Sequence, residues 1–149
     1  MLVRDLMQRD PTTLAVHDAL DVADDIMRLG RVRHLPVVDQ GRLVGVLTQR
    51  DLLRASISSL LQLRYAAERE WLTKVEVRSV MSTTLHTVSP TSTVRHAVEL
   101  MIAHKIGCLP VVTDGALVGL LTETDLLQLL ANQLATAEAK DRLPEFPPD

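Results

Sequence analysis

The chain carries one pattern twice. When the sequence is shifted by 74 positions, residues 3–53 align without a gap onto residues 77–127, and 19 of the 51 aligned pairs are identical. Self-similarity at a fixed spacing predicts two copies of one structural unit. Each copy has roughly fifty residues, too few to bury two helices and a small sheet alone. We therefore expect the copies to pack against each other.

Each copy predicts a strand, a helix, a hairpin and a second helix. In the first copy, apolar residues at three- and four-residue spacing predict a helix capped by Asp18 that ends at Gly30. Two β-branched runs with Gly41 in the short segment between them predict the hairpin. Thr48, with the acidic Asp51 three places later, resembles a capping box and predicts the start of the second helix. The expected fold is α/β (α+β), with two tandem βαββα repeats.

The repeat also sets the expected domain boundaries. Residues 1–55 form the first repeat, 56–76 a linker helix, 77–131 the second repeat and 132–149 a frayed C-terminal tail. Two of the few aromatic side chains, Tyr65 and Trp71, lie in the linker. They either cover a partner or second subunit, or simply pack on the body of the protein.

Composition narrows the classes of partner. The chain has 46% hydrophobic residues, and its 16 basic and 19 acidic side chains nearly balance, so no overall charge would draw it to nucleic acid or an anionic membrane. The N-terminus lacks an apolar signal core, and no uncharged stretch approaches the roughly 20 residues of a membrane span. The single cysteine, Cys108, cannot form an internal disulfide. We expect a cytoplasmic protein.

The first candidate for chemistry is the pair Thr48-x-x-Asp51 and Thr122-x-x-Asp125, each after a Gly-x-Leu strand end. Such a corner exposes backbone N–H groups that suit a phosphate, and the aspartate can accept hydrogen bonds from ribose hydroxyls. Helix capping alone is the competing interpretation. From the residues, the two interpretations are about equally supported.

The second candidate is His34-Leu35-Pro36, repeated as Cys108-Leu109-Pro110. Proline lacks an N–H and interrupts one side of a sheet ladder, which can leave backbone groups free for the edge of a base. The alternative is an ordinary proline in an edge strand, which the residues alone favour.

Basic residues concentrate in the first copy. Arg31, Arg33 and Arg50 flank the proposed cleft, whereas the second copy has Lys105, Gly107 and Thr124 at these positions. A site that grips phosphate is therefore expected at Asp51, although most surface arginines are only solvated.

Catalysis has little support in the sequence. The five histidines show no metal-binding spacing, and the chain shows neither a glycine-rich phosphate loop nor a nucleophile elbow. We expect no enzymatic activity, no bound metal and no required cofactor.

Three repeated motifs resemble those of the cystathionine β-synthase (CBS) domain. They are Val3-Arg4-x-x-Met7, Leu35-Pro36-Val37-Val38 and Gly45-x-Leu47-Thr48-x-x-Asp51-Leu52-Leu53, each with its second copy. The resemblance covers roughly residues 1–55 and 75–130, and the tandem pair resembles a Bateman module. It implies two repeats packed through their sheets with pseudo-twofold symmetry. It also implies two clefts for AMP, ADP, ATP or, less often, S-adenosylmethionine, and pairing of two modules as a homodimer.

The resemblance also implies site residues. Asp51 and Asp125 would hold ribose hydroxyls, and Arg50 with Arg33 would neutralise phosphate in the first site, a role that the second copy lacks. The first site would comprise Thr13, Leu14, Arg33, His34, Pro36, Thr48, Arg50 and Asp51. The second would comprise Thr87, Val88, Cys108, Pro110, Thr122 and Asp125.

The expected function is that of a regulatory module that senses adenine nucleotides and acts on a protein partner that the sequence does not name. The alternatives are a structural dimerisation or docking module without a ligand, and a module that binds S-adenosylmethionine.

Overall fold

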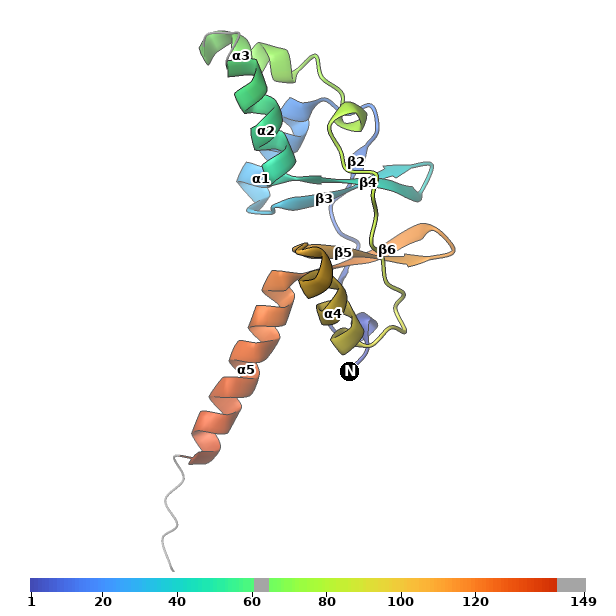
Figure 1. Cartoon of the computed structure of the whole chain (residues 1–149), viewed down its shortest axis with the longest axis vertical. Coiled ribbons are helices and arrows are strands. Elements are labelled where there is room, and N and C mark those ends of the chain that lie inside the picture. Colours follow the sequence, from blue (N-terminus) through green and yellow to red (C-terminus); the bar gives the residue numbers. More distant parts are fainter. Residues whose placement is uncertain (61–64, 142–149) are drawn as a thin grey trace, which may run out of the picture.

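The computed structural model describes residues 1–60 and 65–141, and the side chains of all of these except 57–60, 65–68 and 141. It has two halves stacked along its long axis, with a strand hairpin in each half facing the other (Figure 1). The first half contains β2 (Leu14–Ala15), α1 (Leu20–Gly30), β3 (His34–Asp39), β4 (Arg42–Thr48) and α2 (Gln49–Leu60). This is the expected βαββα order.

The second half repeats that order. Val88 forms an isolated parallel bridge with Val111 in place of the short first strand. It is followed by α4 (Val94–His104), β5 (Cys108–Thr113), β6 (Ala116–Thr122) and α5 (Glu123–Asp141). Both hairpins turn through a pair of residues with positive φ, Gln40-Gly41 and Asp114-Gly115, as type I′ turns require. The α/β fold of two tandem repeats is confirmed.

With β1 at Gln8–Arg9, the strands join into one sheet with the order β1-β6-β4-β3-β2, and β5 pairs with β6 outside that order. Between the halves, β4 and β6 share only the pairing of Arg42 with Ala116. Each half instead has its own hydrophobic core, and a small cluster of Val46, Cys108 and Leu120 lies between them. Because so few backbone bonds join the hairpins, the space between the halves is available for a cleft.

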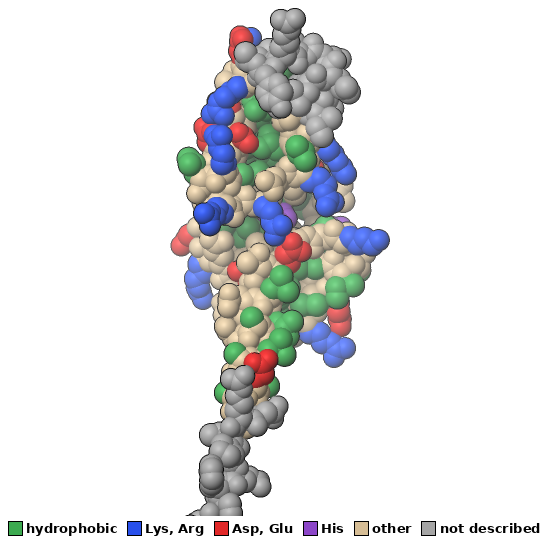
Figure 2. All heavy atoms as spheres, turned by 90° about the vertical axis from the view of Figure 1, so that its left-hand side faces the viewer, with side chains coloured by type: hydrophobic (Ala, Val, Ile, Leu, Met, Phe, Trp, Pro, Cys, Tyr) green, Lys and Arg blue, Asp and Glu red, His purple; other side chains and the backbone are tan. Residues whose placement is uncertain are grey.

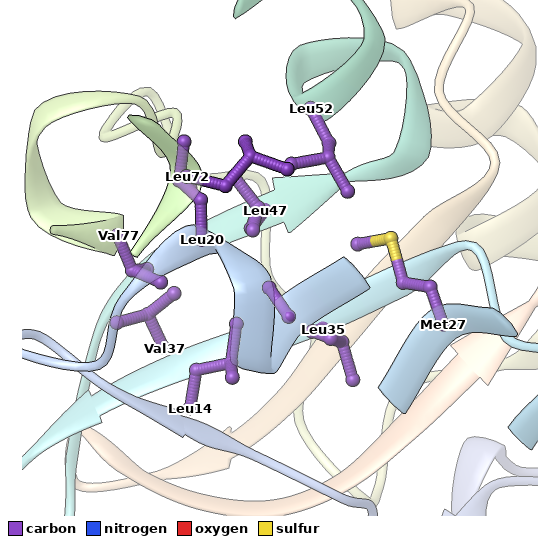
Figure 3. Close-up of a cluster of buried hydrophobic side chains, with 10 residues drawn as sticks. Leu14, Leu20, Met27, Leu35, Val37, Leu47, Leu52, Leu72 and Val77 are labelled. Carbon is purple, nitrogen blue, oxygen red and sulfur yellow. The ribbon is translucent and has the colours of Figure 1, made fainter. Parts of the chain in front are cut away.

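The segment that leads each copy packs on the other copy. Val3, in a 3-10 turn over Val3–Asp5, is fully buried in the second core, and β1 (Gln8–Arg9) pairs with β6. Val77, in the 3-10 turn Val77–Ser79, is fully buried in the first core, where Figure 3 shows it pointing into the same cluster as Val37. The halves are therefore interlocked.

Three local expectations differ from the structure. Asp18 does not cap α1: the N-cap is Ala19, and the Asp18 carboxylate accepts a hydrogen bond from the Ala15 amide at 2.8 Å. The predicted linker helix 56–76 contains the end of α2 and a separate helix, α3 (Tyr65–Leu72). The predicted tail from residue 132 is helical as far as Asp141, because α5 continues there, while 142–149 lie outside the described residues.

The domain boundaries themselves remain predictions. None of the described helices combines the length and apolar character that crossing a membrane requires.

Candidate functional site

The Thr-x-x-Asp corners form complete capping boxes. Asp51 Oδ2 accepts hydrogen bonds from the Thr48 amide at 2.9 Å and the Thr48 hydroxyl at 2.8 Å, and the Asp51 amide donates to Thr48 Oγ1 at 3.1 Å. Thr122 and Asp125 repeat the arrangement at 2.8, 2.8 and 3.4 Å. The capping interpretation is therefore confirmed, but it uses one carboxylate oxygen. Oδ1 of each aspartate has no partner among the described residues.

The expectation of several free amides at the corner is wrong. The Thr48 and Asp51 amides are used within the capping box, and the Gln49 amide donates to the Arg33 carbonyl at 2.9 Å. In the described part of this corner, the Thr48, Gln49 and Asp51 amides are therefore not free for a ligand. A phosphate here would have to be held mainly by cationic side chains.

A cleft of about 1290 Å³ opens beside Asp51 and runs between the two halves. Of the predicted first-site residues, Arg33, His34, Thr48, Arg50 and Asp51 line it. Cys108 and Pro110, predicted for the second site, line the same cleft. Figure 2 shows Lys and Arg side chains gathered near mid-height of the molecule, where the two halves meet.

Seven predicted site residues do not line this cleft: Thr13, Leu14, Pro36, Thr87, Val88, Thr122 and Asp125. Leu14 and Val88 are core residues with 1% and 5% of their surface exposed. Pro36 is likewise fully buried. Thr13 and Thr87 are exposed next to these core positions.

In their place, the cleft contains residues that sequence reasoning missed. Ser82, Thr84, Leu85 and His86, from the segment leading the second copy, line it beside Asp51. They arrive there because Ser82 forms an antiparallel bridge with Val46 of β4, and the Ser82 amide donates to the Val46 carbonyl at 2.9 Å. The exchange of leading segments therefore decides which residues line the cleft. The repeat alone assigned each segment to its own copy.

Cations dominate the charged groups of the cleft. Arg33, Arg50, Arg54 and Lys105 line it together with the carboxylates of Asp51 and Glu123. Arg33 Nη2 and Glu123 Oε1 lie 3.4 Å apart, in an ion pair between the two copies with both side chains about half exposed. This balance favours a ligand with an anionic end.

The half-buried His34 and the buried Cys108 lie at equivalent positions of the two copies. Burial lowers the pKa of His34, and the Arg33 guanidinium lowers it further, while Glu123 and Asp51 act in the opposite sense. Burial, reinforced by Glu123, raises the pKa of the Cys108 thiol to about 12. Cys108 is thus a protonated thiol at neutral pH and a poor nucleophile.

Two further histidines pack together at the cleft: His86 lines it, and His104 lies against His86. The His86 and His104 rings stack with their centroids 3.7 Å apart and an interplanar angle of 22°. Among the described residues, no group of three or more His, Cys, Asp or Glu side chains could hold a metal ion. The arrangement fits a binding cleft with aliphatic and imidazole walls and a cationic rim.

A duplicated βαββα fold with a cleft between its copies defines a class of tandem-repeat modules. The family model of the CBS domain matches residues 3–58 and 77–132. A CBS domain-containing protein of Dictyostelium discoideum is 36% identical over 136 residues, covering 90% of this chain and 94% of that protein. The chain belongs to the CBS domain family.

Other relatives show where such pairs occur. Inosine-5′-monophosphate dehydrogenase of Korarchaeum cryptofilum is 32% identical over 136 residues, covering 91% of this chain but only 25% of that enzyme. CBS domain pairs thus occur both as near full-length relatives of this chain and as parts of enzymes.

Two similar solved structures contain adenosyl ligands. The CBS domain pair of protein MJ0100, in complex with 5′-methylthioadenosine and S-adenosyl-L-methionine, is 27% identical with a TM-score of 0.74, covering 89% of this chain and 98% of that one. CBSX2 in complex with AMP is 25% identical with a TM-score of 0.73, covering 89% and 97%.

Proposed function

We propose that this chain is a regulatory module that binds an adenine nucleotide in the cleft at Asp51 and catalyses no reaction. The observation that carries the proposal is the unused Oδ1 of Asp51, a residue that lines a cleft together with four cationic side chains. A carboxylate oxygen can accept hydrogen bonds from ribose hydroxyls, while the cations neutralise phosphate.

The walls support an adenosyl ligand. Leu85, His86 and Ile106 line the cleft and offer aliphatic and imidazole surfaces to a base. The ligands of the MJ0100 and CBSX2 pairs have the same adenosyl group. AMP, ADP and ATP fit the cationic rim better than S-adenosylmethionine, whose sulfonium is itself a cation. The corner at Thr122 and Asp125 remains a predicted second site.

Regulation follows if the ligand binds one arrangement of the two copies more tightly than another. The difference in affinity then shifts the equilibrium towards the arrangement that binds more tightly. The interlocked segments connect the cleft to both cores. We place the protein in the cytoplasm, as a homodimer that acts on a partner protein and requires no cofactor. Neither nucleic acid nor membrane is part of the proposal.

Thermal unfolding with and without AMP, ADP, ATP and S-adenosylmethionine tests the proposal. A ligand at 100 times its dissociation constant should raise the free energy of unfolding by about 2.7 kcal/mol. Asp51→Asn should abolish most of this gain. Asp125→Asn, which changes the same kind of capping box outside the cleft, is the matched control and should lose less of this gain, because only a ligand at the predicted second site depends on that corner. Unfolding temperatures that no ligand shifts would count against nucleotide binding.

A second candidate function, dimerisation or docking without a ligand, is favoured by one surface. Leu127, Leu130 and Leu134 of α5 are 62%, 48% and 53% exposed and recur at helical spacing. The linker aromatics support docking less well than the sequence suggested. Trp71 is half-buried against the first core, and the side chain of Tyr65 is not among the described ones. Sedimentation of wild type and Leu130→Glu separates the candidates. This function would be favoured by a wild-type dimer that dissociates in the Leu130→Glu variant, provided that nucleotides do not shift the unfolding temperature of the wild type.

A further inference from the structure

The first residue of the helix that follows each capping threonine differs between the copies: it is Gln49 in α2 and Glu123 in α5. The two positions have the same backbone setting, because the Gln49 amide donates to the Arg33 carbonyl and the Glu123 amide to the Gly107 carbonyl, both at 2.9 Å. Their side chains differ in charge. Glu123 reaches across to Arg33, whereas the equivalent combination of Gln49 and Gly107 carries no charge.

Glu123 lies in the cleft that contains Asp51, not only beside its own corner. Its charge and that of Asp51 both act on the half-buried His34, and all three side chains line the same cleft. Asp51 uses one oxygen for the cap and offers the other to the ligand. Glu123 is therefore the remaining carboxylate that the anionic end of a ligand meets.

The backbone does little to offset that repulsion. Since most amides of the α2 corner are already bonded, the anionic end depends on side chains, and Arg33 is one of the four available cations. Arg33 is paired with Glu123 at 3.4 Å, with both side chains about half exposed. Exposed ion pairs of this kind stabilise a fold very little, so a phosphate can replace the Glu123 carboxylate on Arg33.

We propose that Glu123 sets the charge selectivity of the Asp51 cleft by competing with the anionic end of the ligand for Arg33. The proposal rests on the proposed nucleotide binding. Glu123 makes the free energy of binding less favourable in proportion to the negative charge of the ligand's tail. It leaves the binding of a neutral adenosyl ligand unaffected. It thus narrows the difference in affinity between a nucleoside triphosphate and an uncharged adenosyl compound.

Calorimetric titration of the full chain with ATP, AMP and 5′-methylthioadenosine tests this. In Glu123→Gln, the dissociation constant should fall about five- to tenfold for ATP, as expected for removing one like charge near the phosphates. It should fall less for AMP and stay within about twofold for 5′-methylthioadenosine, because the Coulomb energy scales with ligand charge. Added salt should shrink the gain for ATP.

The double variant Arg33→Gln/Glu123→Gln tests the competition itself. Arg33→Gln alone should weaken ATP binding, and in that background Glu123→Gln should bring a clearly smaller gain than in the wild type, because the shared partner is gone. An ATP affinity that Glu123→Gln leaves unchanged, or equal gains for ATP and 5′-methylthioadenosine, would overturn the inference while nucleotide binding stands. A wild-type chain that binds none of the three ligands would overturn the proposed function and this inference with it.

Discussion

Met7 lies directly against Gly119, so that a Cβ atom at Gly119 would fall 2.6 Å from Met7 Sδ and 3.0 Å from the Gln8 carbonyl oxygen. Gly45 meets Met81 in the same way. The methionine of the Val-Arg-x-x-Met motif in each copy therefore packs on the glycine of the other copy's Gly-x-Leu-Thr motif. Two motifs that are repeated in the sequence are thus physical partners across the halves.

Gly119→Ala should lower the free energy of unfolding by about 1–3 kcal/mol, because the added methyl group overpacks the contact with Met7 and the backbone behind it. The matched control is Gly30→Ala, where a Cβ would meet only Val32 methyl groups at 3.8 and 4.0 Å. Since Gly30 lies in α1, that control should be neutral or stabilising. Urea denaturation measures both. Equal midpoints for Gly119→Ala and wild type would contradict the close approach.

Thr48→Ala and Thr122→Ala should each cost about 1 kcal/mol of stability, because each removes the hydroxyl of a complete capping box. Only Thr48 lines the cleft. Titration with ATP should therefore show weaker binding at the Asp51 cleft in Thr48→Ala and unchanged affinity of that cleft in Thr122→Ala. Loss of affinity in both variants would mean that the caps act on binding through general destabilisation.

The Cys108 thiol should resist iodoacetamide at neutral pH in the folded protein and react fully in denaturant, since it is buried and protonated. Because the folded pKa, about 12, lies above the ordinary value of 9.0, the unfolded chain loses its proton first as pH rises. The stability contribution of the neutral thiol is present below pH 9.0 and is lost between 9.0 and about 12. Cys108→Ala should flatten this alkaline decline in a urea series. Rapid alkylation of the native thiol would contradict the buried position.

His34 should make the stability of the protein depend on pH in the acidic range, opposite to the alkaline effect of Cys108. Its pKa is lowered below 6.5 by burial first and by Arg33 second, so the unfolded chain takes up a proton before the folded one. The stability contributed by neutral His34 is present above 6.5 and declines as pH falls through its lowered value. His34→Gln should reduce the fall in unfolding temperature on acidification. His96→Gln, on an exposed side chain of α4, is the control and should leave it unchanged.

Local features of the fold were predictable because their causes lie within a few residues. The helix spacing, the turns at Gly41 and Gly115, and the Thr-x-x-Asp caps depend on neighbours in the chain, and the structure contains all of them. The cap of α1 shows the limit of this reasoning. Asp18 has the right residue type, but its carboxylate instead closes the turn at Ala15 before the helix begins.

The sequence by itself determined two equivalent units, their order of strands and helices, and a corner that presents Asp51 at the end of β4. Only the tertiary structure decided what faces that corner. Burial of Val3 and Val77 in each other's halves is a long-range effect. It carries Ser82 and residues 84–86 to the cleft, while Leu14 and Val88 become core. A repeat specifies which residues are alike, whereas burial of apolar surface across the halves specifies which ones meet.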